Sequence, residues 1–265
     1  MVNYVVIPDK IQKLIGEKCF EIDNIGMSGA SVYLYDDMVL KVESLSFESE
    51  NEYKMMQWLN AKLPVPKIIE HTISNKLSYI LMNKCAGKMA SSDILMAKPQ
   101  LLSELLAETL YQIWHVDVSN CPTDNSLCKK LKQAEYRVTN GMVDVNLCEA
   151  ETFDNEGFRD PEALLYWLQT NIPPEEAVLS HGDLCLPNVF FNDGKLSGLI
   201  DLGRCGIADK WCDIAICYRS IRNNYNGTYT GKQIAGFDEV MFFDALQIKP
   251  DWEKIRYYLL LDELF

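Results

Sequence analysis

The sequence predicts an α+β protein of two lobes, with a β-sheet lobe first and a mainly helical lobe after it. Two observations support this division. Up to about residue 82, short apolar runs alternate with turn signals, which is typical of strands. From residue 99 onward, apolar residues recur at helical spacing. We therefore divide the chain into a nucleotide-binding lobe at 1–82, a linker at 83–90 and a catalytic lobe at 91–265.

The first lobe begins with an expected helix at 8–17, which Pro8 is positioned to start. Two runs with strand character then flank the small-residue turn 25–31, which contains Ser28. A loop of small residues between strands can lie over a triphosphate and donate backbone N–H groups to its oxygens. An ordinary hairpin turn explains the same residues, so the turn alone does not decide between the two.

A single lysine interrupts the next apolar run. Lys41 lies within 39–42, a short expected strand, and Glu52 lies near the start of a helical pattern at about 48–63. Burying an ammonium is costly unless it meets an anion. We therefore expect Lys41 to pair with Glu52, and an edge-strand lysine that reaches solvent is the alternative. Two more strands are expected, at 67–71 and 77–82.

The stretch 178–203 carries the residues best suited to chemistry. Asp183 and Asn188 stand five residues apart in a polar loop, and Asp201 follows a second apolar run beyond a turn at 192–194. Phosphoryl transfer from a nucleotide requires such groups. One carboxylate must orient the incoming hydroxyl, while Mg²⁺ on a second carboxylate and an amide neutralises the phosphates. Side chains that only cap turns are the alternative, which explains each residue but not their joint spacing.

The same spacing occurs in the protein-kinase signature, where an Asp-Phe-Gly supplies the second Mg²⁺ ligand. Here the triplet is Asp201-Leu202-Gly203. We therefore predict a protein-kinase-like two-lobe fold in which Lys41 reaches the α- and β-phosphates of the nucleotide. The linker would then lie against the adenine through Met82, Asn83 and Cys85.

Helical patterns fill the second lobe. Helices are expected at 99–115, 124–140, 161–170 and 251–265, with a flexible loop at 223–237. A further helix is expected within about six residues of Gly203, which leaves no room for the long activation segment of a protein kinase. Gly182 also occupies the position of the arginine in the kinase His-Arg-Asp motif. We therefore expect the phosphate acceptor to be a small molecule.

The amino-acid composition limits the classes of partner that the protein can bind. The 38 acidic and 25 basic residues give a net charge of −13, so we expect no nucleic-acid partner. An acidic face could attract a cationic substrate, although excess carboxylate that only aids solubility is the alternative. The nine cysteines are an odd number without a Cys-x-x-Cys, which indicates cytosolic usage. With no signal segment and no apolar run of membrane-spanning length, we expect a cytoplasmic monomer or weak dimer without a membrane partner.

Two acidic segments are candidates for binding a cation. Glu149 and Glu151 lie in a loop ahead of the catalytic stretch, and Asp262 and Glu263 close the last helix beside Phe265. Negative charges at a helix C-terminus oppose the helix macrodipole, so we expect a cation to meet them. A solvated acidic loop and a frayed acidic end are the alternatives.

Together these residues resemble the aminoglycoside phosphotransferases, most closely the aminoglycoside 3'-phosphotransferases, or kanamycin kinases. The resemblance covers nearly the whole chain. Its motifs are Gly26-Met27-Ser28, Met55–Leu59, Lys62–Lys67, Ser180–Leu184, Ile200–Arg204, Ala208–Trp211, Lys249–Lys254 and Leu260–Phe265. The C-terminal motif is the most specific, because related small-molecule kinases share the hairpin but not that tail.

The resemblance implies an ATP- and Mg²⁺-dependent kinase that phosphorylates the 3'-hydroxyl of kanamycin-like aminoglycosides and confers resistance. The implied nucleotide and catalytic residues are Asp183 as the base, Asn188 and Asp201 as Mg²⁺ ligands, Lys41 on the phosphates and paired with Glu52, and Ser28 in the nucleotide loop. The implied aminoglycoside site is lined by Arg204, Asp262, Glu263 and the Phe265 carboxylate, with Glu149 and Glu151 in the acidic recognition loop.

Three features depart from the family, and they bear on nucleotide preference and drug spectrum. Val39 stands where family members can stack a tyrosine on adenine, the linker reads Asn83-Lys84-Cys85, and the loop before the last helices is longer. A kinase of the same fold acting on choline, homoserine or a macrolide is one alternative, which the carboxylate-rich tail disfavours. A non-catalytic nucleotide-binding module is the other, which the intact site residues disfavour.

Overall fold

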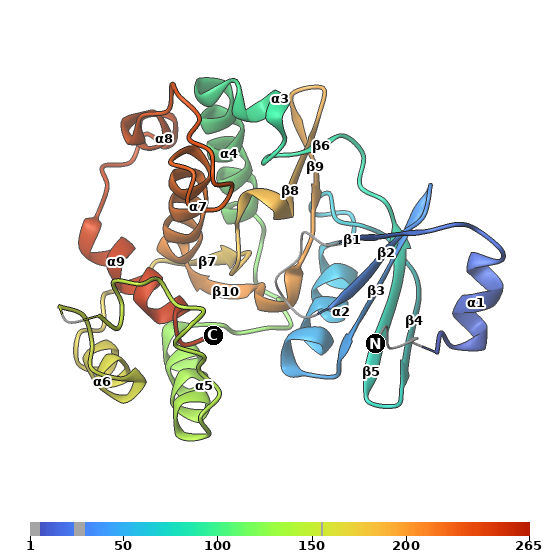
Figure 1. Cartoon of the computed structure of the whole chain (residues 1–265), viewed down its shortest axis with the longest axis horizontal. Coiled ribbons are helices and arrows are strands. Elements are labelled where there is room, and N and C mark those ends of the chain that lie inside the picture. The colour runs from blue at the N-terminus through green and yellow to red at the C-terminus, as the bar shows by residue number, and fades with distance from the viewer. Residues whose placement is uncertain (1–5, 24–29, 155) are drawn as a thin grey trace.

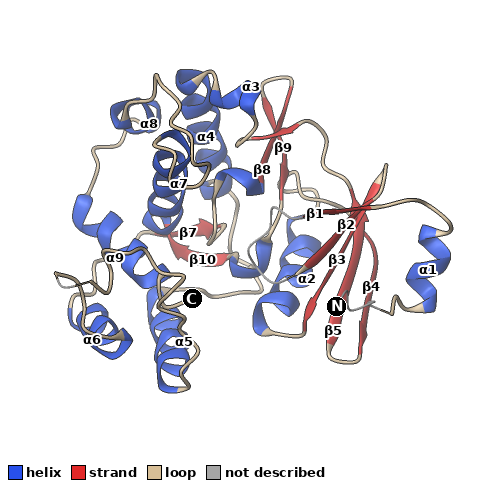
Figure 2. Ribbon diagram, in the orientation of Figure 1, coloured by secondary structure: helices blue, strands red, loops and turns tan. Residues whose placement is uncertain are grey.

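The computed structural model describes residues 6–23, 30–154 and 156–265. A five-stranded antiparallel sheet lies beside a larger, mainly helical part (Figure 1). Figure 2 shows that strands dominate the first of these parts and helices the second. The α+β class predicted from the sequence is confirmed.

The five-stranded sheet has the order β1-β2-β3-β5-β4. Its strands are β1 (Glu21–Asp23), β2 (Ser31–Leu34), β3 (Met38–Ser44), β4 (Ile68–Ser74) and β5 (Leu77–Asn83). On its outer side lies α1 (Asp9–Ile15), and the two share a small core of Ile11, Ile15, Leu40, Val42 and Leu81. Because side chains alternate along a strand, Lys41 points to the opposite face, where α2 lies.

Helix α2 (Phe47–Leu59) connects the sheet to the helical part. It begins with a capping box, in which the Ser46 and Ser49 hydroxyls each accept a hydrogen bond from the other residue's main-chain N–H. It buries Met55, Met56 and Leu59 in the main core. The sequence predicted a helix to residue 63, but the helix ends four residues earlier, because Ala61 takes a φ of 72° that a right-handed helix cannot accommodate.

The helical part surrounds the main hydrophobic core. Its helices are α3 (Asp93–Met96), α4 (Pro99–Trp114), α5 (Leu127–Thr139), α6 (Pro161–Thr170), α7 (Lys210–Tyr225), α8 (Glu239–Leu246) and α9 (Trp252–Asp262). Helix α4 packs against α8, and α7 packs against α9 (Figure 1). The apolar stripe predicted for α4 is confirmed at Leu102, Leu106 and Leu110, which are buried, but not at Leu101, which is 38% exposed. None of the described helices combines the length and the apolar character needed to cross a membrane.

Two small antiparallel sheets position the catalytic stretch. The predicted hairpin is formed by β8 (Val189–Asn192) and β9 (Lys195–Leu199). Its turn residues Asp193 and Gly194 have φ values of 50° and 71°, the positive values that a tight hairpin turn requires. Strand β6 (Lys88–Met89) pairs with β8, and β7 (Ala177–Ser180) pairs with β10 (Gly206–Asp209). The chain therefore enters the segment 181–205, which we call the catalytic loop, from β7 and leaves it through β10.

We keep the division into 1–82, 83–90 and 91–265 as a proposal. In its support, β5 is the last strand of the five-stranded sheet, and the next strand, β6, belongs to the sheet of the catalytic hairpin.

Several further elements differ from the sequence prediction, among them α3 and β6, which were not predicted. Helix α7 starts at Lys210 with the N-cap Asp209 six residues after Gly203, as expected, but strand β10, which was not predicted, lies between them. Helix α7 also extends to Tyr225, into the loop predicted at 223–237, and α8 was not predicted. The extended conformation of β10 comes from its distant partner β7, which local periodicity cannot reveal. Helix α8 is only two turns long, too short for a clear periodic signal.

The main core allows a test of how much α4 contributes to stability. The Leu106 side chain is 0% exposed, and its replacement by alanine is expected to lower the free energy of unfolding by about 2–5 kcal/mol. Leu101 is a matched control, because it lies on the same helix and is 38% exposed. Its replacement by alanine should change that free energy by only about 0.5 kcal/mol. Urea denaturation would measure both, and equal losses would contradict the assigned packing.

Candidate active site

One buried carboxylate holds the loop that follows β7. Asp213, in the first turn of α7, is 0% exposed. It accepts hydrogen bonds at 2.9 Å from the main-chain N–H groups of His181 and Gly182 and from the Ser180 hydroxyl. Because three donors converge on one side chain, the direction in which the chain leaves β7 is fixed. Nothing in the sequence indicates this role of Asp213 beyond its place near the start of an expected helix.

Two neighbours of Asp183 have structural roles. Gly182 has a φ of 80°, and a Cβ atom there would lie 2.1 Å from the main-chain oxygen of Arg204. The arginine of a His-Arg-Asp motif therefore does not fit at this position. His181 is buried, and its Nε2 bonds to the main-chain oxygen of Ile200 at 3.0 Å. Burial lowers the pKa of His181, so the ring is neutral near pH 7 and orients the loop.

Asp183 and Asn188 are joined directly, as their spacing indicated. The Asn188 side-chain amide donates to the main-chain oxygen of Asp183 at 2.9 Å and to its carboxylate at 3.2 Å. These bonds turn the amide nitrogen toward Asp183, so the amide oxygen faces away from it. Burial raises the pKa of Asp183, and the nearby Arg204 guanidinium opposes this rise.

Lys41 lies at the centre of a group of three carboxylates. Its ammonium bonds to Glu52 at 2.7 Å and to Asp201, and it lies 3.6 Å from Glu43. The predicted Lys41–Glu52 contact is therefore present, and the edge-strand alternative is wrong, because β3 lies inside the sheet and Lys41 is 8% exposed. Burial alone would lower the pKa of Lys41, but the three carboxylates raise it, so the group stays charged.

The residues predicted to hold Mg²⁺ fit that ion chemically. The Asn188 amide oxygen and the Asp201 carboxylate are hard oxygen donors, which Mg²⁺ prefers. Among the described residues, no cluster of three or more His, Cys, Asp or Glu side chains is arranged to hold a metal ion. An ion bound here would therefore complete its coordination with phosphate oxygens and water, as Mg²⁺ usually does in nucleotide sites.

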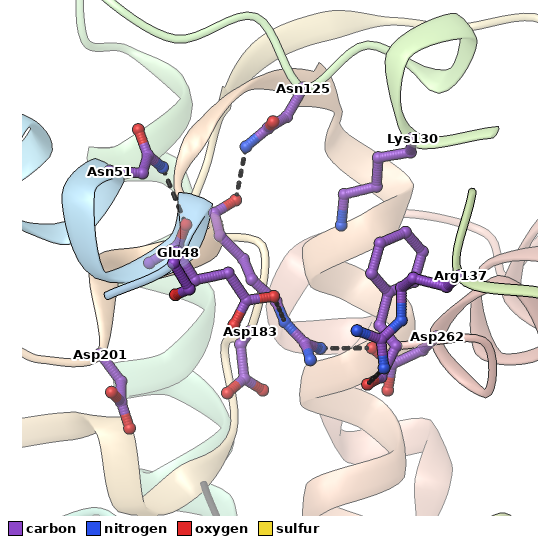
Figure 3. Close-up of polar contacts among 12 residues, drawn as sticks. Glu48, Asn51, Asn125, Lys130, Arg137, Asp183, Asp201 and Asp262 are labelled. Carbon is purple, nitrogen blue, oxygen red and sulfur yellow. Dashed lines mark hydrogen bonds and ion pairs between the residues drawn. The ribbon is translucent and has the colours of Figure 1, made fainter. Parts of the chain in front are cut away.

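Arg204 joins α2 to the end of the chain (Figure 3). It follows Asp201 in the 3-10 turn Leu202–Arg204. Its guanidinium bonds to Glu48 of α2 at 3.1 Å and to Asp262 of α9 at 3.0 Å. The Asn51 side chain of α2 donates to the main-chain oxygens of Gly203 and Cys205, at 2.9 and 2.8 Å. These contacts join α2 to the segment that follows Asp201. Nothing in the sequence indicated this role of Asn51.

Arginines of the protein meet the acidic end of α9, where the sequence predicted a cation. Arg219 bonds to Asp262 and lies 3.4 Å from Glu263. Burial alone would raise the pKa of Asp262, but the guanidinium groups of Arg219 and Arg204 hold it below its usual range. The Glu263 carboxylate also accepts a hydrogen bond from the main-chain N–H of Glu149 at 3.0 Å. The acidic loop and the tail therefore lie together.

The remaining predicted residues have different surroundings. Ser28 lies outside the described residues, and Glu151 is exposed. The Phe265 carboxylate accepts a hydrogen bond from Arg137 at 2.7 Å. In the linker, the main-chain N–H groups of Asn83 and Lys84 already donate to Lys67 and Asp37. Met82 is buried, and Cys85 packs beside Gly198 of β9.

The role of Asp213 can be tested by its removal. Asp213→Ala leaves three buried donors without an acceptor, so we expect a loss of about 3–5 kcal/mol in the free energy of unfolding. Asp244→Ala, on the exposed side of α8, is the control and should stay within about 0.5 kcal/mol of the unchanged protein. Urea denaturation followed by circular dichroism would measure both, and a loss below about 1 kcal/mol for Asp213→Ala would contradict its proposed role.

Comparison with known proteins agrees with this geometry. The model of the phosphotransferase enzyme family matches residues 22–258. The aminoglycoside 3'-phosphotransferase of Enterococcus faecalis is 41% identical, with 98% of each chain covered. A crystal structure of an aminoglycoside-3'-phosphotransferase of type VIII matches with a TM-score of 0.79 at 26% identity, covering 97% of this chain and 98% of that one.

A more distant structure shares the fold. The aminoglycoside phosphotransferase of Streptomyces rimosus, solved with ADP and streptomycin, matches with a TM-score of 0.76 at 22% identity, covering 96% of this chain and 95% of that one. The protein-kinase-like architecture predicted from the sequence is therefore confirmed. The chain belongs to the phosphotransferase enzyme family, among the aminoglycoside phosphotransferases.

Proposed function

We propose that the protein transfers the γ-phosphoryl group of ATP to the 3'-hydroxyl of kanamycin-like aminoglycosides and thereby confers resistance. The observation that carries this proposal is the position of Asp183. It lies between Asp201, which bonds to Lys41, and Asp262, which bonds to Arg204 (Figure 3). Its carboxylate also accepts a hydrogen bond from the Asn188 amide. The relatives named above are aminoglycoside 3'-phosphotransferases, which supports the choice of acceptor.

Asp183 is proposed as the catalytic base. Its carboxylate would accept a hydrogen bond from the attacking sugar hydroxyl and align that oxygen with the γ-phosphorus for in-line displacement. The hydroxyl proton then passes to Asp183 as the new O–P bond forms, and ADP leaves. Most of the rate gain would come from positioning and electrostatics, because phosphoryl transfer needs little covalent chemistry from the protein.

The phosphate side is formed by Lys41, Asn188 and Asp201. Lys41 would contact the α- and β-phosphates while Glu52 holds its ammonium in place. Asn188 and Asp201 would hold Mg²⁺, which supplies charge neutralisation at the phosphates when it is bound. Ser28 and the linker residues Met82, Asn83 and Cys85 are proposed to bind the rest of the nucleotide. ADP in the related Streptomyces rimosus structure supports a nucleotide site in this fold.

The acceptor side would bind ammonium groups through carboxylates. Asp262 and Glu263 come from the tail, and Glu149 and Glu151 from the acidic loop. Each charge-assisted hydrogen bond contributes about 1.5–3 kcal/mol where solvent is excluded. A polycation gains from several separated carboxylates, whereas the acceptors of the same-fold alternatives, choline, homoserine and macrolides, carry fewer cationic groups. We also propose that the protein acts in the cytoplasm as a monomer or weak dimer, and its nine free cysteines support that compartment.

The reaction and its position on the sugar can be tested together. ADP release from Mg·ATP would be measured with kanamycin, with a kanamycin that lacks the 3'-hydroxyl, and without an acceptor. We expect turnover with kanamycin only. Turnover with the deoxy compound would contradict the proposed position, and turnover with neither would overturn the choice of acceptor.

The role of Asp183 predicts a selective loss of turnover. Asp183→Asn keeps the size of the side chain but removes the base, so kcat should fall by about 10²- to 10⁴-fold while ATP still binds. Asp193→Asn, in the exposed turn of the hairpin, is the matched control and should keep normal kcat. A non-catalytic nucleotide-binding module would show the same activity, or none, in both variants.

The raised pKa of Asp183 predicts the acid side of the pH profile. Only the ionised carboxylate can accept the proton, so kcat should fall as pH decreases through this pKa, which burial raises above the usual value for Asp of about 4. The fall should therefore begin at a higher pH than an ordinary carboxyl group would give. Residual turnover of Asp183→Asn should not follow the same curve, and a shared curve would assign the titration to another group.

A further inference from the structure

A residue of α5 binds the end of the chain, residues 260–265, which we call the tail. The Arg137 guanidinium donates to the main-chain oxygen of Leu264 and to a carboxylate oxygen of Phe265, each at 2.7 Å. Two bonds from one guanidinium to consecutive residues fix both the position and the orientation of this segment. Leu264 itself is 0% exposed, so the part of the tail that Arg137 binds is also packed against the core.

The ring of Phe265 lies among three cationic groups. Lys130 Nζ is 5.6 Å from the ring centroid, and the guanidinium carbons of Arg137 and Arg204 are 5.7 and 5.8 Å from it. Lys130 and Arg137 both come from α5, and Figure 3 shows their side chains extending toward the same region. Cations near an aromatic ring are attracted by its quadrupole. The Phe265 side chain therefore anchors the tail to α5.

Arg137 differs from the other arginines at the tail. Arg204 and Arg219 bond to the carboxylates of Asp262 and Glu263 and partly neutralise them. Arg137, within the described part of the chain, makes its hydrogen bonds to the oxygens of Leu264, Phe265 and Met142 and to no side-chain carboxylate. It therefore fixes the tail without neutralising Asp262 or Glu263.

The same guanidinium also reaches the acidic loop. Arg137 donates to the main-chain oxygen of Met142 at 3.3 Å, at the start of the segment that leads to Glu149. At the other end of that segment, the Cys148 thiol and the Glu149 N–H contact Glu263, at 3.4 and 3.0 Å. One arginine is therefore connected to both segments that carry the proposed acceptor carboxylates.

We propose that Arg137 is a positioning residue for acceptor binding, which holds the tail and the acidic loop in one arrangement of carboxylates. This proposal rests on the proposed function, since it concerns the affinity for a cationic acceptor. Arg137 touches neither Lys41 nor Asp201, so it acts on the acceptor side only. Its loss should therefore raise KM for the acceptor and leave the nucleotide and the chemical step unchanged.

Three variants test the proposal by steady-state kinetics with kanamycin and Mg·ATP. Arg137→Met keeps the length of the apolar stem and should raise KM for kanamycin by about tenfold or more, with kcat and KM for ATP within about twofold. Lys132→Met, an exposed position on the same helix, removes the same charge and should change neither KM. Arg137→Lys keeps the charge but loses the planar guanidinium that donates to two oxygens at once, and should leave KM for kanamycin raised. Full recovery of KM for kanamycin in Arg137→Lys, or an equal rise of that KM in Lys132→Met, would overturn the positioning role of Arg137 in favour of a general charge effect.

A second measurement separates this proposal from the proposed function. Hydrogen exchange of the peptides that cover 259–265 should be faster in Arg137→Met than in Lys132→Met, with or without any acceptor. Absence of turnover with kanamycin in the unchanged protein would overturn the proposed function. Unchanged exchange in the tail, or a fall in kcat without a change in KM for kanamycin, would overturn the positioning role of Arg137.

Discussion

The attachment of α2 to the 3-10 turn after Asp201 is the constraint on which the active site depends. Asn51 donates to two main-chain oxygens of that turn and accepts a hydrogen bond from Thr123. Its neighbour Glu52 holds Lys41, and Lys41 in turn reaches Asp201. Because Asn51 is 2% exposed, water does not compete strongly for these bonds. The relative position of the sheet and the catalytic loop is therefore set by one buried amide and the ion pairs beside it.

Charge is distributed very differently on the two sides of Asp183. On the phosphate side, one ammonium faces the three carboxylates of Glu43, Glu52 and Asp201. This local excess of negative charge favours a bound cation, which agrees with the proposed Mg²⁺ site. On the acceptor side, two arginines face Asp262, so its charge is largely compensated before any acceptor arrives. The overall charge of −13 does not reveal this difference.

Sequence reasoning succeeded where the signal is local. The five-residue spacing of Asp183 and Asn188, the Asp-Gly turn and the apolar stripe of α4 each depend on neighbouring residues, and the structure contains all three features. It failed where a residue acts through distant partners. Asn51, Asp213, Arg137 and Arg219 are ordinary polar residues of helices in the sequence, and their roles arise only when the fold brings their partners to them. Strand β10 belongs to the same class, because its extended form depends on β7.

The compensated tail also decides where a cationic acceptor gains most. An ammonium that approaches Asp262 must share that carboxylate with Arg204 and Arg219, so part of the gain is offset by weaker arginine contacts.

Glu149 is different. Its Oε1 atom is buried and has no hydrogen-bond partner among the described residues, and the nearest guanidinium, that of Arg222, is 3.8 Å away. A buried carboxylate oxygen without a donor is unfavourable, so an acceptor ammonium that reaches Glu149 would relieve that penalty as well as gain a charge-assisted bond. In the proposed reaction, an ammonium at Glu149 therefore gains more than one at Asp262, and the tail also holds the loop of Glu149 in place through Glu263.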